Sequence, residues 1–224
     1  MFQGFSDATI DFMWGIRFNN ERSWFEANKE TYLRTFYQPM KELAQEVYER
    51  YHEAHPELDL MYKVSRIYRD ARRLYGRGPY KDHLWFSLRR PDTEISDTPV
   101  LWFELEPEGW SYGMGYYSAT PLTMAKFRRR LDLDPARFLK LARRLEQQDI
   151  FQLEGEDYRR PKGGCAPGLE HWYNKKRLSL MAEEKHSDVL FRHELADRLY
   201  EGFELLYPLY DYFQSLSGDP DPRD

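Results

Sequence analysis

Apolar residues recur three and four positions apart over the first 55 residues, and this spacing predicts helices. A first helix is expected to begin after an N-cap at Ser6 and to end near Asn19-Asn20, because asparagine suits both a helix end and the next cap. A second helix is expected over Glu21–Phe36. A third should begin at Pro39, since proline fits the first helical turn, and end at His55-Pro56.

The pattern changes near Met61, where apolar and polar residues begin to alternate, and alternation predicts β-strands. Short turns between the alternating segments favour an antiparallel meander. We therefore expect Asp82–Arg90 and Pro99–Glu106 to be adjacent antiparallel strands. The full set of expected strands is Tyr62–Arg69, Asp82–Arg90, Pro99–Glu106 and Trp110–Tyr117.

Helical patterns return in the C-terminal half. Thr120-Pro121 and Asp134-Pro135 each combine a capping side chain with a proline at the first helical position, which is typical of a helix start. A short strand is expected at Arg177–Ala182. The last helix should cover Ser187–Leu216, with a kink or a restart at Pro208.

These elements predict an α+β fold in which an antiparallel sheet of about four or more strands is flanked by N-terminal and C-terminal helices. Hydrophobic residues make up 41% of the chain and aromatic residues 17%, with a mean hydropathy of −0.83. Large rings bury much apolar area each, so a core built from them suffices for 224 residues. We expect a single domain over residues 1–216 and a disordered tail over 217–224.

The charge distribution is uneven. Residues 63–90 contain nine basic and two acidic residues, although the whole chain carries a net charge of −5. Because clustered like charges repel, such a segment needs acidic neighbours or an anionic ligand. The sequence pI of about 5.8 disfavours a general nucleic-acid binder.

Two interpretations of this cluster stay open. In the first, four cationic side chains bind the phosphate or carboxylate groups of a ligand: Arg66, Arg69, Arg72 and Lys81. In the second, the same cations form ion pairs with acidic residues of the sheet and turn: Asp70, Asp82, Glu104 and Glu106. If the glycine-rich turn Gly76–Gly78 folds back as in a hairpin, Lys81 should lie close to the segment Arg66–Arg72.

His83 and Asp70 are the candidate catalytic residues. His83 has an intrinsic pKa suited to proton transfer and shares a strand face with Lys81, although a histidine bonded to a carboxylate is an equal alternative. Asp70 lies between arginines, which lower the pKa of a carboxyl group and make it a poor base near neutrality. A structural clamp on Arg69 or Arg72 is its alternative role.

We expect no metal and no cofactor. The segment His52-Glu53-Ala54-His55 is one residue short of the H-E-x-x-H spacing that brings two imidazoles together on a helix. Cys165 is the only cysteine, which excludes an intrachain disulfide, and we expect an incidental loop thiol. No segment approaches the length of a membrane span, so we expect a cytoplasmic protein without membrane association.

Several segments resemble the bacterial and fungal family called domain of unknown function 2461 (DUF2461). Asn19-Asn20 with Trp24-Phe25 is similar to its N-N-x-x-W-F element. Arg66–Arg72 followed by Pro79–His83 resembles its R-I-x-R-D-x-R and P-Y-K-x-H core. The resemblance extends over nearly the whole chain through Gly113–Tyr117 and Arg160–Gly163. It implies an α+β fold with helices around an antiparallel sheet, and it implies no activity.

Two functional hypotheses follow. The first is a site at the basic cluster for a phosphorylated or otherwise anionic small molecule, which the protein either only binds or also processes enzymatically. The second is a non-catalytic interaction module whose basic face docks an acidic protein or a nucleic-acid backbone. A concave site and weak salt dependence favour the first hypothesis, and a flat face with steep salt dependence favours the second. Whether the protein is an enzyme, and its oligomeric state, stay open.

Overall fold

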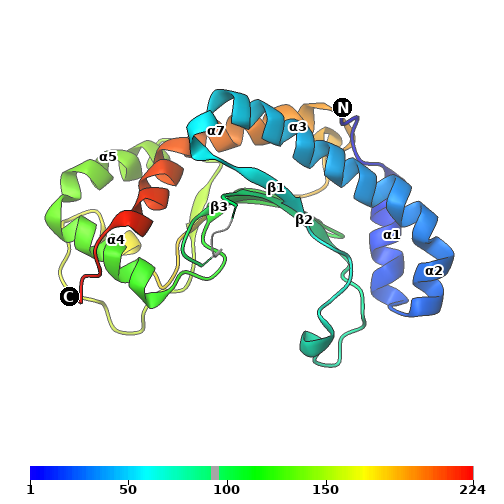
Figure 1. Cartoon of the computed structure of the whole chain (residues 1–224), viewed down its shortest axis with the longest axis horizontal. Helices are drawn as coiled ribbons and strands as arrows, with labels where there is room; N and C mark the ends of the chain where they lie inside the picture. The colour runs from blue at the N-terminus through cyan, green and yellow to red at the C-terminus, as the bar shows by residue number, and fades with distance from the viewer. Residues whose placement is uncertain (92–95, 224) are drawn as a thin grey trace. The chain divides into compact units, whose positions relative to one another are not determined.

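The computed structural model describes residues 1–91 and 96–223 and shows an α+β fold (Figure 1). Helices precede and follow the strands along the chain, as the hydrophobic pattern predicts. The α-helices are α1 (Asp7–Phe18), α2 (Arg22–Thr31), α3 (Gln38–Ala54), α4 (Pro121–Leu133), α5 (Pro135–Glu146), α6 (Glu170–Tyr173) and α7 (Glu194–Gln214).

The strands form one six-stranded antiparallel sheet in the order β1-β2-β3-β4-β6-β5. Their bounds are β1 (Met61–Val64), β2 (Leu84–Arg89), β3 (Val100–Glu106), β4 (Gly109–Gly115), β5 (Gln152–Glu154) and β6 (Ser179–Glu184). The expected adjacency of the strands here called β2 and β3 is confirmed. The edge strand β5 was not expected; it pairs antiparallel with β6, placing Gln152 opposite Met181.

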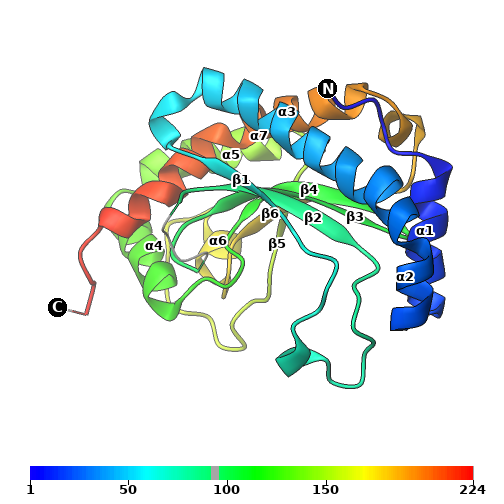
Figure 2. The ribbon, with the colours of Figure 1, turned by 45° about the vertical axis from the view of Figure 1, so that its right-hand side comes forward.

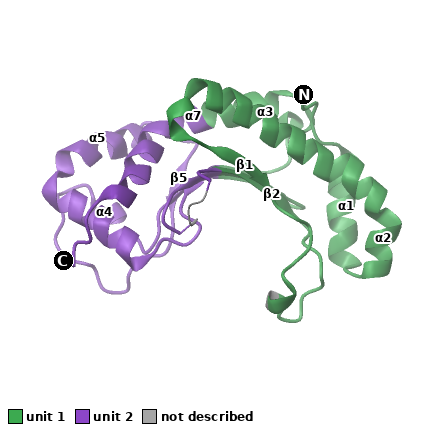
Figure 3. Ribbon diagram, viewed as in Figure 1, with its two compact units in different colours: residues 1–88, 102–112, 183–202 green, residues 89–101, 113–182, 203–224 purple. Residues whose placement is uncertain are grey.

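The chain divides into two compact units, each assembled from several segments (Figure 3). Unit 1 comprises residues 1–88, 102–112 and 183–202. Unit 2 comprises residues 89–101, 113–182 and 203–224. The single-domain organisation over residues 1–216 and the disordered tail stay predictions.

In unit 1, α3 lies over β1 on one face of the sheet (Figure 2). Alternation along β2 decides which side chains meet the helices: Leu84, Phe86 and Leu88 are completely buried, whereas Trp85 is only half-buried. The ring of Phe86 packs 5.6 Å from that of Phe103 on β3. The opposite face of these two strands carries half-buried and exposed side chains, among them Trp85 on β2 and Glu104 and Glu106 on β3.

The helical segment between α2 and α3 differs from the sequence-based expectation. No break precedes Pro39; instead a π-helical segment, η1 (Tyr32–Tyr37), joins the two helices. A proline inside a helix lacks an N–H and leaves the carbonyl four residues earlier without its donor. That carbonyl belongs to Thr35, and it accepts a hydrogen bond of 2.6 Å from the Thr9 hydroxyl on α1. The π-helical turn thus accommodates Pro39 within one continuous helix.

In unit 2, both predicted helix caps are present. The Thr120 hydroxyl accepts a hydrogen bond from the Thr123 N–H at 3.0 Å, and the Asp134 carboxylate accepts one from the Arg137 N–H at 3.2 Å. Gly113 lets the backbone of Leu180 approach, because a Cβ there would lie 1.9 Å from the Leu180 carbonyl oxygen. Pro208 does not restart the helix, since α7 is one helix through this position.

Candidate functional site

The segment between β1 and β2 folds back on itself, as the hairpin argument predicts. The Lys81 N–H donates to the Ile67 carbonyl at 2.7 Å, and the Arg69 N–H donates to the Pro79 carbonyl at 2.8 Å. Tyr68 and Tyr80 form an antiparallel bridge between them. The expected single strand Tyr62–Arg69 is therefore interrupted after β1, but its far end still pairs with the residues that precede β2.

The corner between α1 and α2 holds this folded-back segment in place. The Asn20 side chain donates to the Tyr80 carbonyl at 2.9 Å and accepts from the Tyr80 N–H at 3.0 Å. The Tyr80 ring stacks on Phe25 of α2 with ring centres 4.3 Å apart. Gly78 leaves room for the Asn20 amide, which a Cβ at that position would meet at 2.3 Å. These contacts fix the backbone immediately before Lys81.

Lys81 is half-buried beside other cations. The pKa of its ammonium group is lowered to about 8, mainly by burial and also by Arg69 and Arg66, whereas Glu104 acts in the opposite direction. The ammonium group lies 5.8 Å from the centre of the Trp85 ring. Among the residues that the structure describes, none forms an ion pair with Lys81 within 4.0 Å. The predicted approach of Lys81 to the arginine segment is confirmed.

The three arginines of the predicted anion site differ in their surroundings. Arg69 donates to the Tyr80 carbonyl at 2.8 Å, and one of its terminal nitrogens lies 3.8 Å from the Asp82 carboxylate. Arg72 is exposed and forms an ion pair of 2.8 Å with Asp70. Arg66 is also exposed, and no ion pair joins it to another residue in the described part of the chain.

Asp70 caps the short 3-10 helix η3 (Ala71–Arg73) and accepts from the Arg72 N–H at 3.0 Å. The alternative structural role, a clamp on Arg72, is therefore the one that the geometry supports. Arg72 forms an ion pair with Asp70 on the exposed turn. The cations that act on Lys81 are Arg69 and Arg66, and not Arg72.

Asp82 links α1 to the start of β2. Its carboxylate accepts from the Arg17 side chain at 2.5 Å and lies 2.9 Å from His83 Nδ1. The hydrogen bonds to His83 and Arg17 hold the pKa of the Asp82 carboxyl group well below its usual range. Arg17 is itself held by a second ion pair, to Glu108 in the turn between β3 and β4. Asp82 is thus an ionised acceptor of fixed position.

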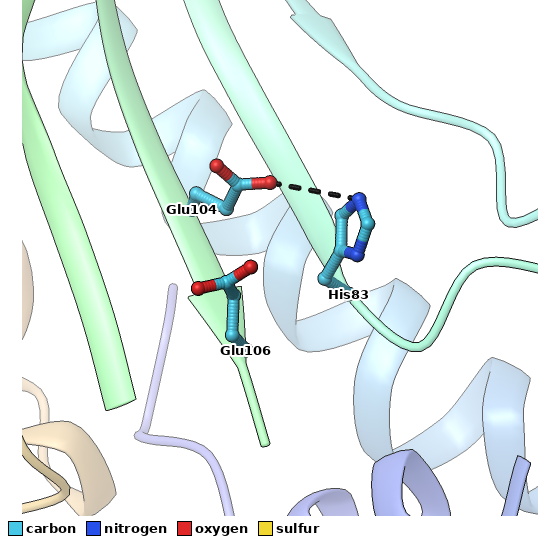
Figure 4. Close-up of side chains that lie close together, drawn as sticks. All are labelled: His83, Glu104 and Glu106. Atoms are coloured by element: carbon cyan, nitrogen blue, oxygen red, sulfur yellow. Dashed lines mark ion pairs between the residues drawn. The ribbon is translucent and has the colours of Figure 1, made fainter. Parts of the chain in front are cut away.

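His83 faces two carboxylates on β3 (Figure 4). Its Nε2 atom lies 3.6 Å from a Glu104 carboxylate oxygen, and ligand atoms of His83, Glu104 and Glu106 all lie within 4.8 Å of one another. The side chains of His83 and Glu104 are 22% and 29% exposed, and Glu106 is exposed. An imidazole nitrogen and two carboxylate oxygens are groups that hold divalent metal ions.

Glu104 has an unusual environment for a carboxylate. Burial raises its pKa, and the nearby Glu106 and Asp82 carboxylates raise it further, although His83 and Lys81 act in the opposite direction. No hydrogen-bond donor reaches the Glu104 carboxylate from the described residues. A half-buried carboxylate without a donor is costly, so this position favours a bound cation or proton.

The sequence reasoning missed this cluster because it searched for metal ligands by spacing along the chain. Glu104 and Glu106 were expected only as partners of the basic cluster. Their shared face was visible from the alternation of β3, and His83 precedes the neighbouring strand, so the expected register of β2 and β3 was the signal that could have joined them. The premise that no ligand cluster exists is corrected; the absence of a bound metal stays a prediction.

The remaining candidates lie elsewhere. Cys165 is half-buried, and burial together with the Glu170 carboxylate raises the pKa of its thiol. Such a thiol is protonated near neutrality, which agrees with the expected incidental role. His55 follows α3, and its Nδ1 lies 3.6 Å from Glu57 rather than in a group of ligands with His52.

Comparison with known proteins agrees with the motifs around Lys81. A model of the family described as conserved hypothetical protein (DUF2461) matches residues 8–212. The chain belongs to the DUF2461 family. The match includes every element of the candidate site, from α1 to the turn after β3. No curated protein matches the chain.

A helix that crosses a lipid bilayer must be both long and apolar. Within residues 1–91 and 96–223, no helix is both long enough and apolar enough to cross one.

Proposed function

We propose that the folded-back segment between β1 and β2 binds an anionic small molecule beside the polar face of β2 and β3 in unit 1, and phosphorylated compounds are the best-matched class. The observation that carries the proposal is the position of Lys81: a half-buried ammonium group lies near Arg66 and Arg69 without an ion pair to any described residue. A ligand phosphate would supply the missing acceptor, and Lys and Arg donors suit its geometry.

Ion pairs with acidic residues, the second interpretation of the basic cluster, involve only some of its cations. Arg72 is satisfied by Asp70, and Arg69 by the Tyr80 carbonyl and Asp82. Lys81 and Arg66 are left without such partners among the described residues. We therefore narrow the predicted anion site to these two side chains, with Arg69 beside them, and leave Arg72 and Asp70 out of it.

His83 is the candidate for proton transfer to or from the bound molecule. Its Nδ1 is engaged with Asp82, so Nε2 is the ring atom that faces the polar surface. Enzymatic processing rests on this single group and on its proximity to Glu104. Location in the cytoplasm accompanies the proposal as an expectation from the sequence.

A thermal-shift series with inorganic phosphate and a panel of phosphate monoesters tests the proposal. A ligand that binds only the folded state raises its stability by about 2.7 kcal/mol at a hundredfold excess over Kd. We expect at least one compound to raise the melting temperature of the wild type, and Lys81→Met to abolish that shift. Lys41→Met is the matched control, because Lys41 is an exposed lysine on α3.

Two results would contradict anion binding: no compound shifts the wild-type melt, or Lys81→Met retains the full shift. Repeating the titration at increasing salt separates the alternative function. A phosphate-backbone binder loses affinity steeply with salt, whereas a small-molecule site with few phosphate contacts loses it gradually.

A further inference from the structure

Three potential metal ligands meet on the polar face of unit 1. His83 lies immediately before β2, and Glu104 and Glu106 project from β3 toward it (Figure 4). Two carboxylates so close repel each other, and no hydrogen-bond donor from the described residues offsets the repulsion at Glu104. A divalent cation between them would reverse the sign of this interaction.

The imidazole ring of His83 is oriented by a carboxylate at its second nitrogen, as is typical of histidines that bind metal ions. A ligating histidine donates its other ring N–H to a carboxylate or carbonyl, which fixes the tautomer and the ring orientation. Asp82 lies 2.9 Å from Nδ1 and is itself ionised and oriented by Arg17. With Asp82 as the acceptor, Nδ1 carries the proton, and Nε2 is then the ring atom that can bind a metal ion beside Glu104 and Glu106.

Lys81 does not neutralise the Glu104 and Glu106 carboxylates through an ion pair. It exerts an electrostatic effect on Glu104, but no ion pair within 4.0 Å joins the two side chains. Glu106 is exposed and has no ion pair with any described residue either. The carboxylates therefore face each other and the imidazole of His83, whose Nε2 atom lies 3.6 Å from Glu104, and not a neighbouring ammonium group.

We propose that His83 Nε2, Glu104 and Glu106 bind one divalent transition-metal ion of the Mn²⁺, Fe²⁺ or Zn²⁺ class. A nitrogen donor with two carboxylates suits these ions better than Ca²⁺ or Mg²⁺, which prefer oxygen ligands throughout. Neighbouring ligands about 2.1 Å from an octahedral ion lie roughly 3 Å apart. The His83–Glu104 separation of 3.6 Å approaches this. Ligand atoms of all three residues lie within 4.8 Å of one another, so metal binding requires the exposed Glu106 side chain to move closer.

Three protein ligands leave coordination positions open for water or for a ligand atom. The inference goes beyond the proposed anion site, because the metal ligands include neither Lys81 nor Arg66. His83 belongs to both proposals, and an ion on its Nε2 atom would occupy the position through which the ring exchanges a proton. The two are therefore separable: Lys81→Met should remove the anion-induced thermal shift and leave metal binding in place.

Titration of the EDTA-treated full chain with Mn²⁺ tests the site. The electron paramagnetic resonance signal of the aqueous ion reports the free concentration, and isothermal titration calorimetry with Zn²⁺ gives a second stoichiometry. We expect one ion per chain. His83→Asn and Glu104→Gln should each weaken binding by more than the roughly 10–100-fold that the loss of an outer-shell partner costs.

Matched controls are available on exposed surface. Glu183→Gln on β6 and His52→Asn on α3 change the same residue types outside the cluster, and both should bind as the wild type does. Glu106→Gln alters an exposed ligand, so it should fold normally and still lose affinity. The proposal is overturned if the wild type binds neither ion, or if folded Glu104→Gln and Glu106→Gln bind with unchanged affinity.

Discussion

Three consecutive residues before β2 carry most of the chemistry of unit 1, and each faces a different partner. Lys81 lies near Arg66, Arg69 and Glu104, whereas Asp82 is bound by Arg17 and His83. His83 in turn faces β3. The hydrogen bonds of Asn20 to Tyr80 fix the backbone before this triplet, and strand β2 begins directly after it.

Arg17 is predicted to support the metal site through Asp82. Arg17→Met removes the ion pair that orients the Asp82 carboxylate, so the His83 ring loses its fixed acceptor. We expect the affinity for Mn²⁺ to fall by about 10-fold, within the range for outer-shell groups. Arg34→Met is the control, since Arg34 is exposed on η1. Equal affinities in the two variants would show that the clamp does not act on the site.

Cys165 is predicted to be a slow nucleophile near neutrality. Burial and Glu170 raise its thiol pKa above the ordinary value of about 8.5, so the reactive thiolate forms only at more alkaline pH. We expect the rate of alkylation by iodoacetamide to rise with pH, with a midpoint above that of a cysteine in a short peptide measured alongside. A midpoint below that of the peptide would contradict the protonated-thiol assignment.

At the scale of elements, capping residues close in the sequence predict where helices begin. Alternation of apolar and polar residues predicts β2, β3 and β4. Caps such as Thr120 and Asp134 act within three residues, so the sequence displays them directly. The contacts that build the site are not local. Asn20 meets Tyr80 across 60 residues, and Arg17 meets Asp82 across 65. No periodicity encodes such pairs.

Two misses have different physical causes. The three residues of β5 are too few to display alternation, and pairing with β6 alone defines them as a strand. The π-helical segment η1 depends on a tertiary hydrogen bond, from Thr9 to Thr35, that relieves the proline at position 39. The approach of Lys81 to the segment Arg66–Arg72 was anticipated, because the chain folds back through the glycine-rich turn Gly76–Gly78.

The corner between α1 and α2 is predicted to determine the position of Lys81. Asn20→Ala removes two hydrogen bonds to the Tyr80 backbone and leaves both backbone groups without these partners. We expect the free energy of unfolding to fall by about 1–3 kcal/mol, at roughly 0.5–1.5 kcal/mol per hydrogen bond. The anion-induced thermal shift should also decrease.

Chemical denaturation checks this prediction against Asn28→Ala. Asn28 donates within its own helix, to the Trp24 carbonyl at 2.8 Å, and is not part of the corner. A loss of stability in Asn20→Ala no larger than in the control would show that the corner does not hold the segment.

At the scale of the whole molecule, the two compact units share their elements. Strands β2, β3, β4 and β6 and helix α7 each contribute residues to both units. This chain connectivity supports the expected single domain over residues 1–216.

We therefore predict that the protein unfolds in one cooperative transition. Five of the six tryptophans lie in unit 1, whereas Trp172 lies in unit 2, so tryptophan fluorescence reports mainly on unit 1. Far-ultraviolet circular dichroism reports on the helices of both units. The two probes should give coincident urea transitions. Transitions with clearly different midpoints would show that the units unfold separately.

The central claim is that the polar face of β2 and β3 in unit 1 is a ligand site. The most direct test is a crystal structure of the protein with MnCl₂ and a phosphate monoester, with anomalous data collected at a wavelength where manganese scatters strongly. The account predicts one anomalous peak bounded by His83, Glu104 and Glu106, and phosphate density within hydrogen-bonding distance of the Lys81 ammonium group. Well-ordered His83, Glu104, Glu106 and Lys81 side chains without such peaks, or peaks elsewhere only, would contradict it.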